Sequence, residues 1–183
     1  MSTLYLIRHG KTSANEAHLY CGSTDLPLSE GGRQELKTLT YDIHPQVIIT
    51  SGMKRTEETL NILFGELPHD VSREFREIDF GIFEMKSYED LKEDPDYQAW
   101  ITGDNFRNVP PEGESGLQMQ ERILKALEPV LRSNQDTLIV THGGVIAAIL
   151  QSLFPEEEKN LYSWQPKPGH GYEITGHHYR PIP

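Results

Sequence analysis

The chain has 183 residues, enough for one domain with a substantial core, and its 36% hydrophobic and 25% charged residues are typical of a globular protein. The formal net charge of −11 argues against nucleic acid or an anionic membrane as a partner, because both would be repelled. Its single cysteine, Cys21, excludes an internal disulfide framework and favours a reducing compartment, so we expect a cytoplasmic protein.

Strand and helix patterns alternate along the chain. Short apolar runs predict buried strands at Thr3 to Ile7, Val47 to Thr50 and Leu138 to Val140. Helical spacing predicts helices over Ser29 to Leu39, Met53 to Phe64, Glu114 to Leu131 and Val145 to Leu153, with a kink or an early end at Pro129. No run approaches the ~18 apolar residues of a membrane span. The alternation predicts a three-layer α/β/α sandwich with a mainly parallel central sheet.

Two of the predicted strands end in the same way. Arg8, His9 and Gly10 follow the first strand, and His142 and Gly143 follow the last. Ligands of parallel sheets bind at the carboxyl ends of the strands, so we expect both histidines at one site.

An ordered set of motifs carries a family resemblance. The set comprises "LYLIRHGKT", Asn15, "YCGSTDLPLSEGGRQE" from Tyr20, Ser51 to Arg55 in "SGMKRTEETL", Glu77 in "REIDFG", Gly113 to Ser115 in "PEGES", and His142 in "THGG". In this order the motifs resemble the histidine phosphatase superfamily, the phosphoglycerate mutase-like proteins. The resemblance implies a single domain over residues 1–183, with a small helical cap over the site inserted at about residues 82–115.

The resemblance also assigns catalytic roles. It makes His9 the nucleophile, which would pass through a phosphohistidine, and Glu77 the general acid. Arg8, Arg55 and His142 would hold the phosphate oxygens. These residue types suit the chemistry, since a phosphate monoester carries about two negative charges and guanidinium groups bind its oxygens in planar forks. Neutral imidazole is a good nucleophile near neutral pH.

Further residues are expected to contact the substrate. They are Gly10, Thr12, Asn15, Cys21, Gly22 and Gly143. Without a Cβ, Gly10 and Gly143 would let backbone N–H groups approach the anion. Glu74, Asp79 and Glu84 are alternative acids near Glu77.

No metal or other cofactor is expected, because arginines and histidines supply the positive charge. His170, His177 and His178 raise the alternative of a metal site, but no cysteine or carboxylate spacing accompanies them, and we expect exposed or sheet-edge histidines. Cys21 as a nucleophile is the weaker alternative to His9. The acidic run from Glu156 to Glu158 predicts a solvated helix start.

The predicted function is hydrolysis of a small phosphorylated metabolite. The segment "GIFEM" resembles the α-ribazole phosphatase branch, which makes α-ribazole 5′-phosphate a candidate substrate. A phosphoglycerate mutase and a non-catalytic phosphate-binding regulatory protein are the alternatives. Between residues 82 and 115 the cations are Lys86, Lys92 and Arg107 among many carboxylates, which disfavours a second phosphate and therefore the mutase. The sequence leaves the oligomeric state open.

Overall fold

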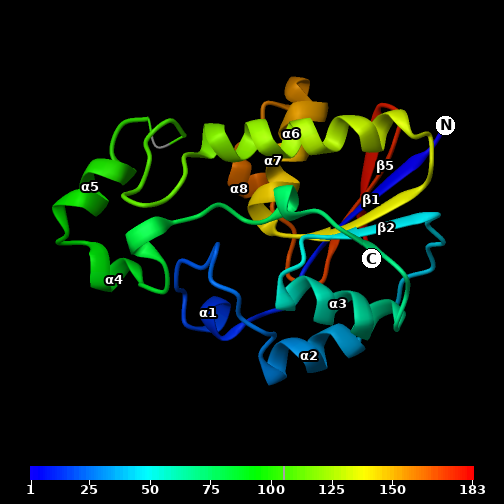
Figure 1. The fold of residues 1–183 in the computed structure, drawn as a ribbon, viewed down its shortest axis with the longest axis horizontal. Coiled ribbons are helices and arrows are strands. Elements are labelled where there is room, and N and C mark those ends of the chain that lie inside the picture. Colours follow the sequence, from blue (N-terminus) through cyan, green and yellow to red (C-terminus); the bar gives the residue numbers. More distant parts are fainter. Residues whose placement is uncertain (105) are drawn as a thin grey trace.

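A six-stranded sheet forms the centre of the computed structural model, which describes residues 1–104 and 106–183 (Figure 1). The strand order is β3-β2-β4-β1-β5-β6. The parallel strands are β1 (Thr3–Arg8), β2 (Val47–Thr50), β3 (Asp70–Val71) and β4 (Thr137–Thr141), and the antiparallel ones are β5 (Gly171–Thr175) and β6 (His178–Ile182). The mainly parallel sheet and its three predicted strands are confirmed, whereas β3 and the β5–β6 hairpin were not predicted.

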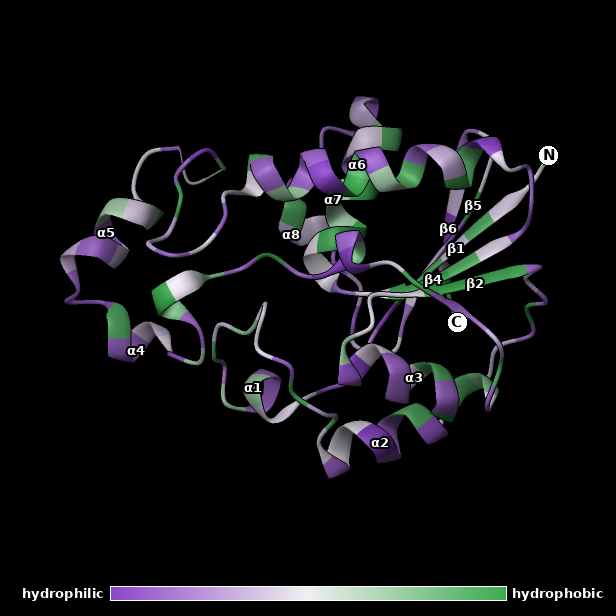
Figure 2. Ribbon diagram, viewed as in Figure 1, coloured by the Kyte–Doolittle hydropathy of each residue, from purple (hydrophilic) through white to green (hydrophobic). Residues whose placement is uncertain are grey.

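Helices cover both faces of this sheet. α6 (Gly116–Arg132), α7 (Gly143–Leu153) and α8 (Leu161–Trp164) lie on one side, and α2 (Glu30–Lys37) and α3 (Lys54–Phe64) lie on the other (Figure 1). Strand side chains alternate between the two cores. Leu4 and Leu6 of β1 belong to the core with α6 and α7, whereas Ile7 packs with Leu60 of α3. Figure 2 shows β2 and β4 as largely hydrophobic. The predicted three layers are confirmed.

The helix boundaries follow capping residues. Ser29 caps α2 by accepting from the Gly32 N–H, and Ser115 caps α6 in a capping box. Pro129 lies inside α6, but the helix continues to Arg132, so the early end does not occur. Pro129 removes the N–H that would bind the Lys125 carbonyl, and the residues after it complete the last turn. The acidic run forms an exposed 3₁₀ turn, Pro155–Glu157.

A small lobe stands apart from the sandwich at the left of Figure 1. It contains α4 (Tyr88–Leu91), α5 (Pro95–Ile101) and the 3₁₀ turn Gly81–Phe83. Its own core consists of buried Phe83, Leu91 and Tyr97. This core is separate from the two beside the sheet. We propose that residues 1–183 form one domain, in which this lobe is a cap inserted at about residues 82–115. The remaining short elements are α1 (Ser13–Glu16) and the 3₁₀ turn Arg73–Phe75.

Candidate active site

The sheet places the two histidines side by side. β1 and β4 are parallel neighbours with Arg8 opposite Thr141, so the residues that follow these strands leave the sheet at the same edge. The His9 N–H donates to the Thr141 carbonyl over 3.0 Å. The rings of His9 and His142 are buried, and their centroids lie 5.1 Å apart. The structure thus brings the two histidines together at one edge, as expected.

The tautomer of His9 follows from its hydrogen bond. Its Nδ1 lies 2.6 Å from the carbonyl oxygen of Gly10, which can only accept. The proton is therefore on Nδ1, and the lone pair is on Nε2. Burial, and then the Arg55 guanidinium, lower the pKa of His9 well below the ordinary histidine value. The ring is thus neutral and has a free nucleophilic nitrogen.

His142 has one satisfied and one unsatisfied nitrogen. Its Nε2 lies 2.9 Å from the Ser51 hydroxyl, while its buried Nδ1 has no hydrogen-bond partner among the described residues. When the Ser51 hydroxyl donates to Nε2, Nδ1 carries the proton and becomes a donor without an acceptor. Burial, and then Arg55, also lower the pKa of His142 well below its usual value. An anion at this point would satisfy the unpaired donor.

Arg8 and Arg55 come from different elements and share one property. Arg8 ends β1 and donates from Nη1 to the Pro166 carbonyl over 2.8 Å, while its buried Nε has no partner among the described residues. Arg55, in the first turn of α3, donates to the carbonyls of Gly22 and Thr24 over 2.7 and 2.8 Å. Neither guanidinium forms an ion pair with a carboxylate within the described part of the chain. Their charge is available to a ligand.

Glu77 reaches the N-terminus of α7. Its Oε2 accepts from the Gly144 N–H over 3.1 Å, and its Oε1 accepts from the Ile78 N–H over 3.0 Å. A side chain at Gly144 would collide with this carboxylate, so the glycine is needed for the contact. The arrangement puts a carboxyl group beside the start of α7, for which His142 is the N-cap residue.

An arginine holds the backbone around Glu77. Arg122 of α6 donates to the carbonyl of Glu77 over 3.1 Å and to that of Glu74 over 2.5 Å. The same guanidinium forms a two-pronged ion pair with Glu114, at 3.1 and 2.5 Å. Because both partners are mostly buried, this pair fixes the segment more firmly than an exposed pair would.

Glu84, one of the alternative acids, has a different function. Its carboxylate accepts from the backbone N–H groups of Gly22, Ser23 and Phe80 over 2.8–3.1 Å, and from the Thr24 hydroxyl over 2.9 Å. The donors from Gly22 to Thr24 belong to the loop whose carbonyls bind Arg55. Glu84 therefore shapes the loop that holds Arg55.

Two expected substrate contacts differ from the prediction. The Gly10 N–H donates to the Thr59 hydroxyl over 3.0 Å and is not free for an anion, while the Gly10 carbonyl orients His9. Thr12 caps α1 in a capping box with Asn15, and its hydroxyl donates to the Asn15 Oδ1 over 3.1 Å. Since that oxygen also accepts from the Thr12 N–H, only the amide nitrogen of Asn15 is left to face a ligand.

The remaining predicted contacts lie around the same site. A Cβ on Gly143 would lie 3.1 Å from the Arg8 guanidinium, so this glycine gives Arg8 its space. Gly22 packs against the Ile78 carbonyl too closely for any side chain. The Cys21 thiol is half-buried and donates to the Thr24 carbonyl over 3.5 Å. Burial raises the pKa of this thiol.

Comparison with known proteins identifies the family. The model of the histidine phosphatase superfamily (branch 1) matches residues 4–182. The chain belongs to the histidine phosphatase superfamily. It is 32% identical over 177 residues to the adenosylcobalamin/α-ribazole phosphatase of Salmonella typhimurium, covering 91% of this chain and 86% of that protein.

Other relatives carry both phosphatase and mutase names. A probable phosphoglycerate mutase of Yersinia enterocolitica is 29% identical over 88% of this chain and 80% of that protein. A crystal structure of a candidate α-ribazole-5′-P phosphatase from Escherichia coli superposes with a TM-score of 0.83 at 26% identity, covering 98% of this chain and 94% of that one. The family and these relatives bear out the expected phosphatase and its fold.

A cavity of about 370 Å³ lies beside Glu77, the proposed general acid. Cys21 and Gly144 also line it. Its other lining residues are largely aromatic and apolar and include Tyr20, Phe80, Trp100, Ile101, Phe106, Met119, Leu161 and Tyr162. Within the described residues, the buried Nε1 of Trp100 has no hydrogen-bond partner. This aromatic cavity offers an apolar surface next to the proposed acid.

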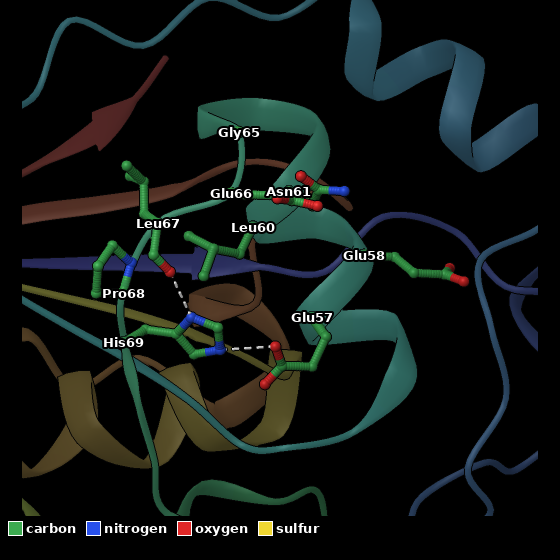
Figure 3. A pocket seen from close by; sticks show the side chains of 9 residues that line it. All are labelled: Glu57, Glu58, Leu60, Asn61, Gly65, Glu66, Leu67, Pro68 and His69. Carbon is green, nitrogen blue, oxygen red and sulfur yellow. Dashed lines mark hydrogen bonds and ion pairs between the residues drawn. The ribbon is translucent and has the colours of Figure 1, made fainter.

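A larger cavity, of about 560 Å³, lies away from this site at the end of α3 (Figure 3). Within it His69 donates from Nδ1 to the Leu67 carbonyl, and its Nε2 lies 2.7 Å from Glu57. Both nitrogens face acceptors, and first the Leu67 carbonyl, then Glu57, raise the pKa of His69. None of the residues that line this cavity is one of the predicted site residues, so it is a separate feature.

The described residues contain neither a candidate metal cluster nor a helix suited to crossing a membrane. No cluster of three or more His, Cys, Asp or Glu side chains that could bind a metal occurs among residues 1–104 and 106–183. His177 and His178 are exposed, and His178 begins β6 at the sheet edge, as expected. No helix in this part of the chain combines the length and apolar character needed to cross a membrane.

Sequence reasoning missed several residues of the site. Gly144 escaped notice because a glycine pair after a histidine gives no sign of which glycine contacts a distant carboxylate. Ser51 lay inside a quoted motif without a role, although a buried serine at the end of a strand is a signal for a hydrogen bond. Arg122 had no local signal, because both carbonyls that it binds lie more than forty residues away in sequence.

Proposed function

We propose that the protein hydrolyses a small-molecule phosphate monoester through a phosphohistidine on His9. Nε2 of His9 attacks phosphorus and the ester P–O bond breaks, while protonated Glu77 gives its proton to the leaving oxygen. Arg8, Arg55 and the Nδ1–H of His142 bind the phosphoryl oxygens as charge shifts onto them. No metal is needed in this scheme.

In the second step a water replaces the leaving group. Glu77, now ionised, takes a proton from this water, and the water oxygen attacks phosphorus. The P–N bond breaks, inorganic phosphate forms, and His9 regains its lone pair. Glu77 is protonated again, so the cycle closes without any further reactant.

One observation carries the proposal. Buried polar atoms without partners are rare and costly in folded proteins. Of the four such side-chain atoms in the described residues, the Nε of Arg8 and the Nδ1 of His142 belong to the cluster around His9. Phosphate oxygens would satisfy both. Because the complete set of nucleophile, acid and cations is present, a non-catalytic phosphate-binding protein is the weaker alternative.

The substrate favoured by this site is α-ribazole 5′-phosphate or a similar phosphate with an apolar ring. The relative from Salmonella typhimurium carries α-ribazole in its name. In support, aromatic rings such as Trp100 and Phe106 line the cavity beside Glu77 and could pack on a base or a sugar. The single cysteine fits a reducing compartment, and the proposal includes a cytoplasmic location.

The mutase alternative has less support from the cap. Lys92 pairs with Glu89 at 2.7 Å, and Arg107 pairs with Asp104 at 3.1 Å. Most of the few cap cations are therefore already neutralised, and the cap offers little to a bisphosphorylated acid. Hydrolysis requires only one bound phosphate and access for water.

A substrate panel tests this proposal. Initial rates would be measured with chelator present for α-ribazole 5′-phosphate, 3-phosphoglycerate, a nucleoside 5′-monophosphate and an aryl phosphate. We expect release of inorganic phosphate with the highest kcat/KM on α-ribazole 5′-phosphate. Preferred turnover of 3-phosphoglycerate to its isomer would favour the mutase, and no turnover of any substrate would favour the binding protein. A loss of activity that Mg²⁺ or Zn²⁺ restores would contradict the metal-free scheme.

A further inference from the structure

The arginines of this acidic protein divide into two groups. Most of them lie within ion-pair distance of a carboxylate: Arg33, Arg107, Arg122, Arg132 and Arg180. Among the described residues, the arginines outside any ion pair are Arg8, Arg55, Arg73 and Arg76. The first two are the proposed phosphate ligands. Arg73 and Arg76 have no assigned role. They form no ion pair among the described residues, although carboxylates outnumber basic side chains in this chain of net charge −11.

Arg73 and Arg76 are held on one rigid segment. They begin and follow the 3₁₀ turn Arg73–Phe75, where side chains three residues apart lie on the same side. The segment is fixed at several points. Ser72 N–H donates to the Thr50 carbonyl over 2.9 Å, and Phe75 is buried with its carbonyl accepting from Thr141 over 2.6 Å. The two guanidiniums therefore project from a fixed base directly before Glu77.

Two cavities meet at this arginine pair. One, of about 360 Å³, is lined by both arginines together with Glu77. The other, of about 300 Å³, is lined by both arginines together with Ser51, the residue that contacts His142. The pair thus lies beside the proposed acid, on a side that the aromatic cavity does not share.

Most carboxylates that line the same two cavities already have donors. Glu114 binds Arg122, and Asp79 accepts from the Gly81 N–H over 2.8 Å. Glu57 accepts from His69, and Asp25 accepts from the Lys54 N–H over 2.8 Å. These four carboxylates already accept hydrogen bonds, so they do not depend on Arg73 and Arg76 as donors. Because both arginines line the same two cavities, an anion bound there would be attracted by both positive charges.

We propose that Arg73 and Arg76 form a second oxyanion site beside Glu77, outside the catalytic pocket. Paired guanidiniums recognise the oxygens of a phosphate or a carboxylate through planar donor forks. Such an anion has two sources, a second anionic group on the substrate or free inorganic phosphate. The site lies before residue 82, so the scarcity of cations in the cap does not apply to it.

The test compares two double variants with equal loss of charge. Arg73→Ala/Arg76→Ala removes the site, and Arg132→Ala/Arg180→Ala removes two exposed, ion-paired arginines elsewhere. Binding of inorganic phosphate would be titrated by its stabilisation against thermal unfolding. We expect about three- to tenfold weaker phosphate binding in the first variant than in the control. This readout does not depend on turnover, so it remains valid if the proposed hydrolysis fails.

Kinetics then separate the two sources. The ratio of kcat/KM for carboxylated aryl phosphates to that for the aryl phosphate without a carboxylate would be measured in the wild type and both variants. A wild-type preference for the carboxylated compounds that disappears only in Arg73→Ala/Arg76→Ala assigns the site to the substrate's second anion. A change in phosphate binding alone assigns it to free phosphate. If neither quantity differs between the two double variants, the proposal is wrong.

Discussion

Hydrogen bonding separates the roles of two nearby carboxylates, Glu77 and Glu84. Glu77 contacts Gly144 at the start of α7, next to His142, and lines the aromatic cavity. Glu84 is surrounded by donors from the Gly22 to Thr24 loop and from Phe80. These contacts fit the proposed role of Glu77 as general acid, whereas those of Glu84 hold a loop.

Glu77→Gln tests the general-acid role, because it keeps the size of the side chain and removes the proton. An alkyl phosphate has a strongly basic leaving group and needs that proton, whereas nitrophenolate leaves without it. We expect a loss in kcat/KM, which reports cleavage of the ester bond, of ~10²-fold or more on alkyl phosphates and a clearly smaller loss on nitrophenyl phosphate. Glu84→Gln is the matched control and should affect both substrates equally. Equal losses for Glu77→Gln would mean that Glu77 only positions the site.

Cys21 lines the aromatic cavity beside Glu77, but its environment does not favour a nucleophile. Burial raises the pKa of its thiol, so the thiolate is scarce at neutral pH. We expect Cys21→Ser to retain kcat within about threefold, and the wild type to react slowly with iodoacetamide at pH 7. Steady-state rates and the time course of alkylation check this. A loss as severe as that of His9→Ala would make Cys21 the nucleophile.

Among the elements, the segment that carries Glu77 depends on α6. Arg122 ties the carbonyls of Glu74 and Glu77 to the helix and pairs with Glu114, which itself accepts from the Asp79 N–H over 3.3 Å. Glu77 therefore owes its position to contacts made by its backbone as well as by its side chain.

Removing Arg122 should loosen this segment. For Arg122→Ala we expect a loss of about 2–3 kcal/mol in the free energy of unfolding, because a mostly buried carboxylate is left unpaired. We also expect kcat/KM to fall about tenfold on alkyl phosphates and less on nitrophenyl phosphate, since a displaced Glu77 protonates the leaving oxygen poorly. Arg132→Ala, on the same helix in an exposed pair, is the control. Equal loss on both substrates would show a structural role alone.

The elements also show where sequence reasoning succeeds. The apolar runs that became β1, β2 and β4 are buried on both faces, and nothing competes with that pattern. α7 begins at Gly143, two residues before the predicted start, because glycines carry no hydrophobic signal. The β5–β6 hairpin contains histidine, arginine and proline in an edge strand, where one side faces solvent and the apolar pattern is weak.

At the scale of the whole molecule, His142 and His69 should change the pH dependence of stability in opposite directions, because folding lowers the pKa of the first and raises that of the second. The folded pKa of His142 is lowered by burial, so the unfolded chain binds more protons and stability falls as pH drops below about 6.5. The pKa of His69 is raised by the Leu67 carbonyl and by Glu57. Its contribution is present below about pH 6.5 and is lost as pH rises through its folded pKa.

Two single variants separate these effects. Between pH 7.5 and 5.5, His142→Gln should lose less stability than the wild type, whereas His69→Gln should lose more. Denaturant unfolding at several pH values measures the difference. Parallel curves for wild type and His142→Gln would show that His142 is not held neutral in the folded protein.

At the same scale, the family resemblance was enough to predict most residues of the candidate site from the sequence. The order of Arg8-His9-Gly10, Arg55, Glu77 and His142 along the chain was enough, because parallel strands collect their carboxyl ends at one edge. The uses of the backbone could not be foreseen. That Thr59 occupies the Gly10 N–H, and that Arg73 and Arg76 lack carboxylate partners within the described residues, depends on contacts distant in sequence.

The most direct test of the account is the covalent intermediate on His9. Wild-type enzyme would be mixed with an aryl phosphate in chelator, quenched within milliseconds at alkaline pH, and examined by peptide mass spectrometry. We expect an acid-labile phosphate on the peptide that contains His9, on the ring nitrogen Nε2, and none in His9→Ala, which should have no turnover. Phosphate release at a near-normal rate by His9→Ala, or a phosphorylated residue other than His9, would contradict the account.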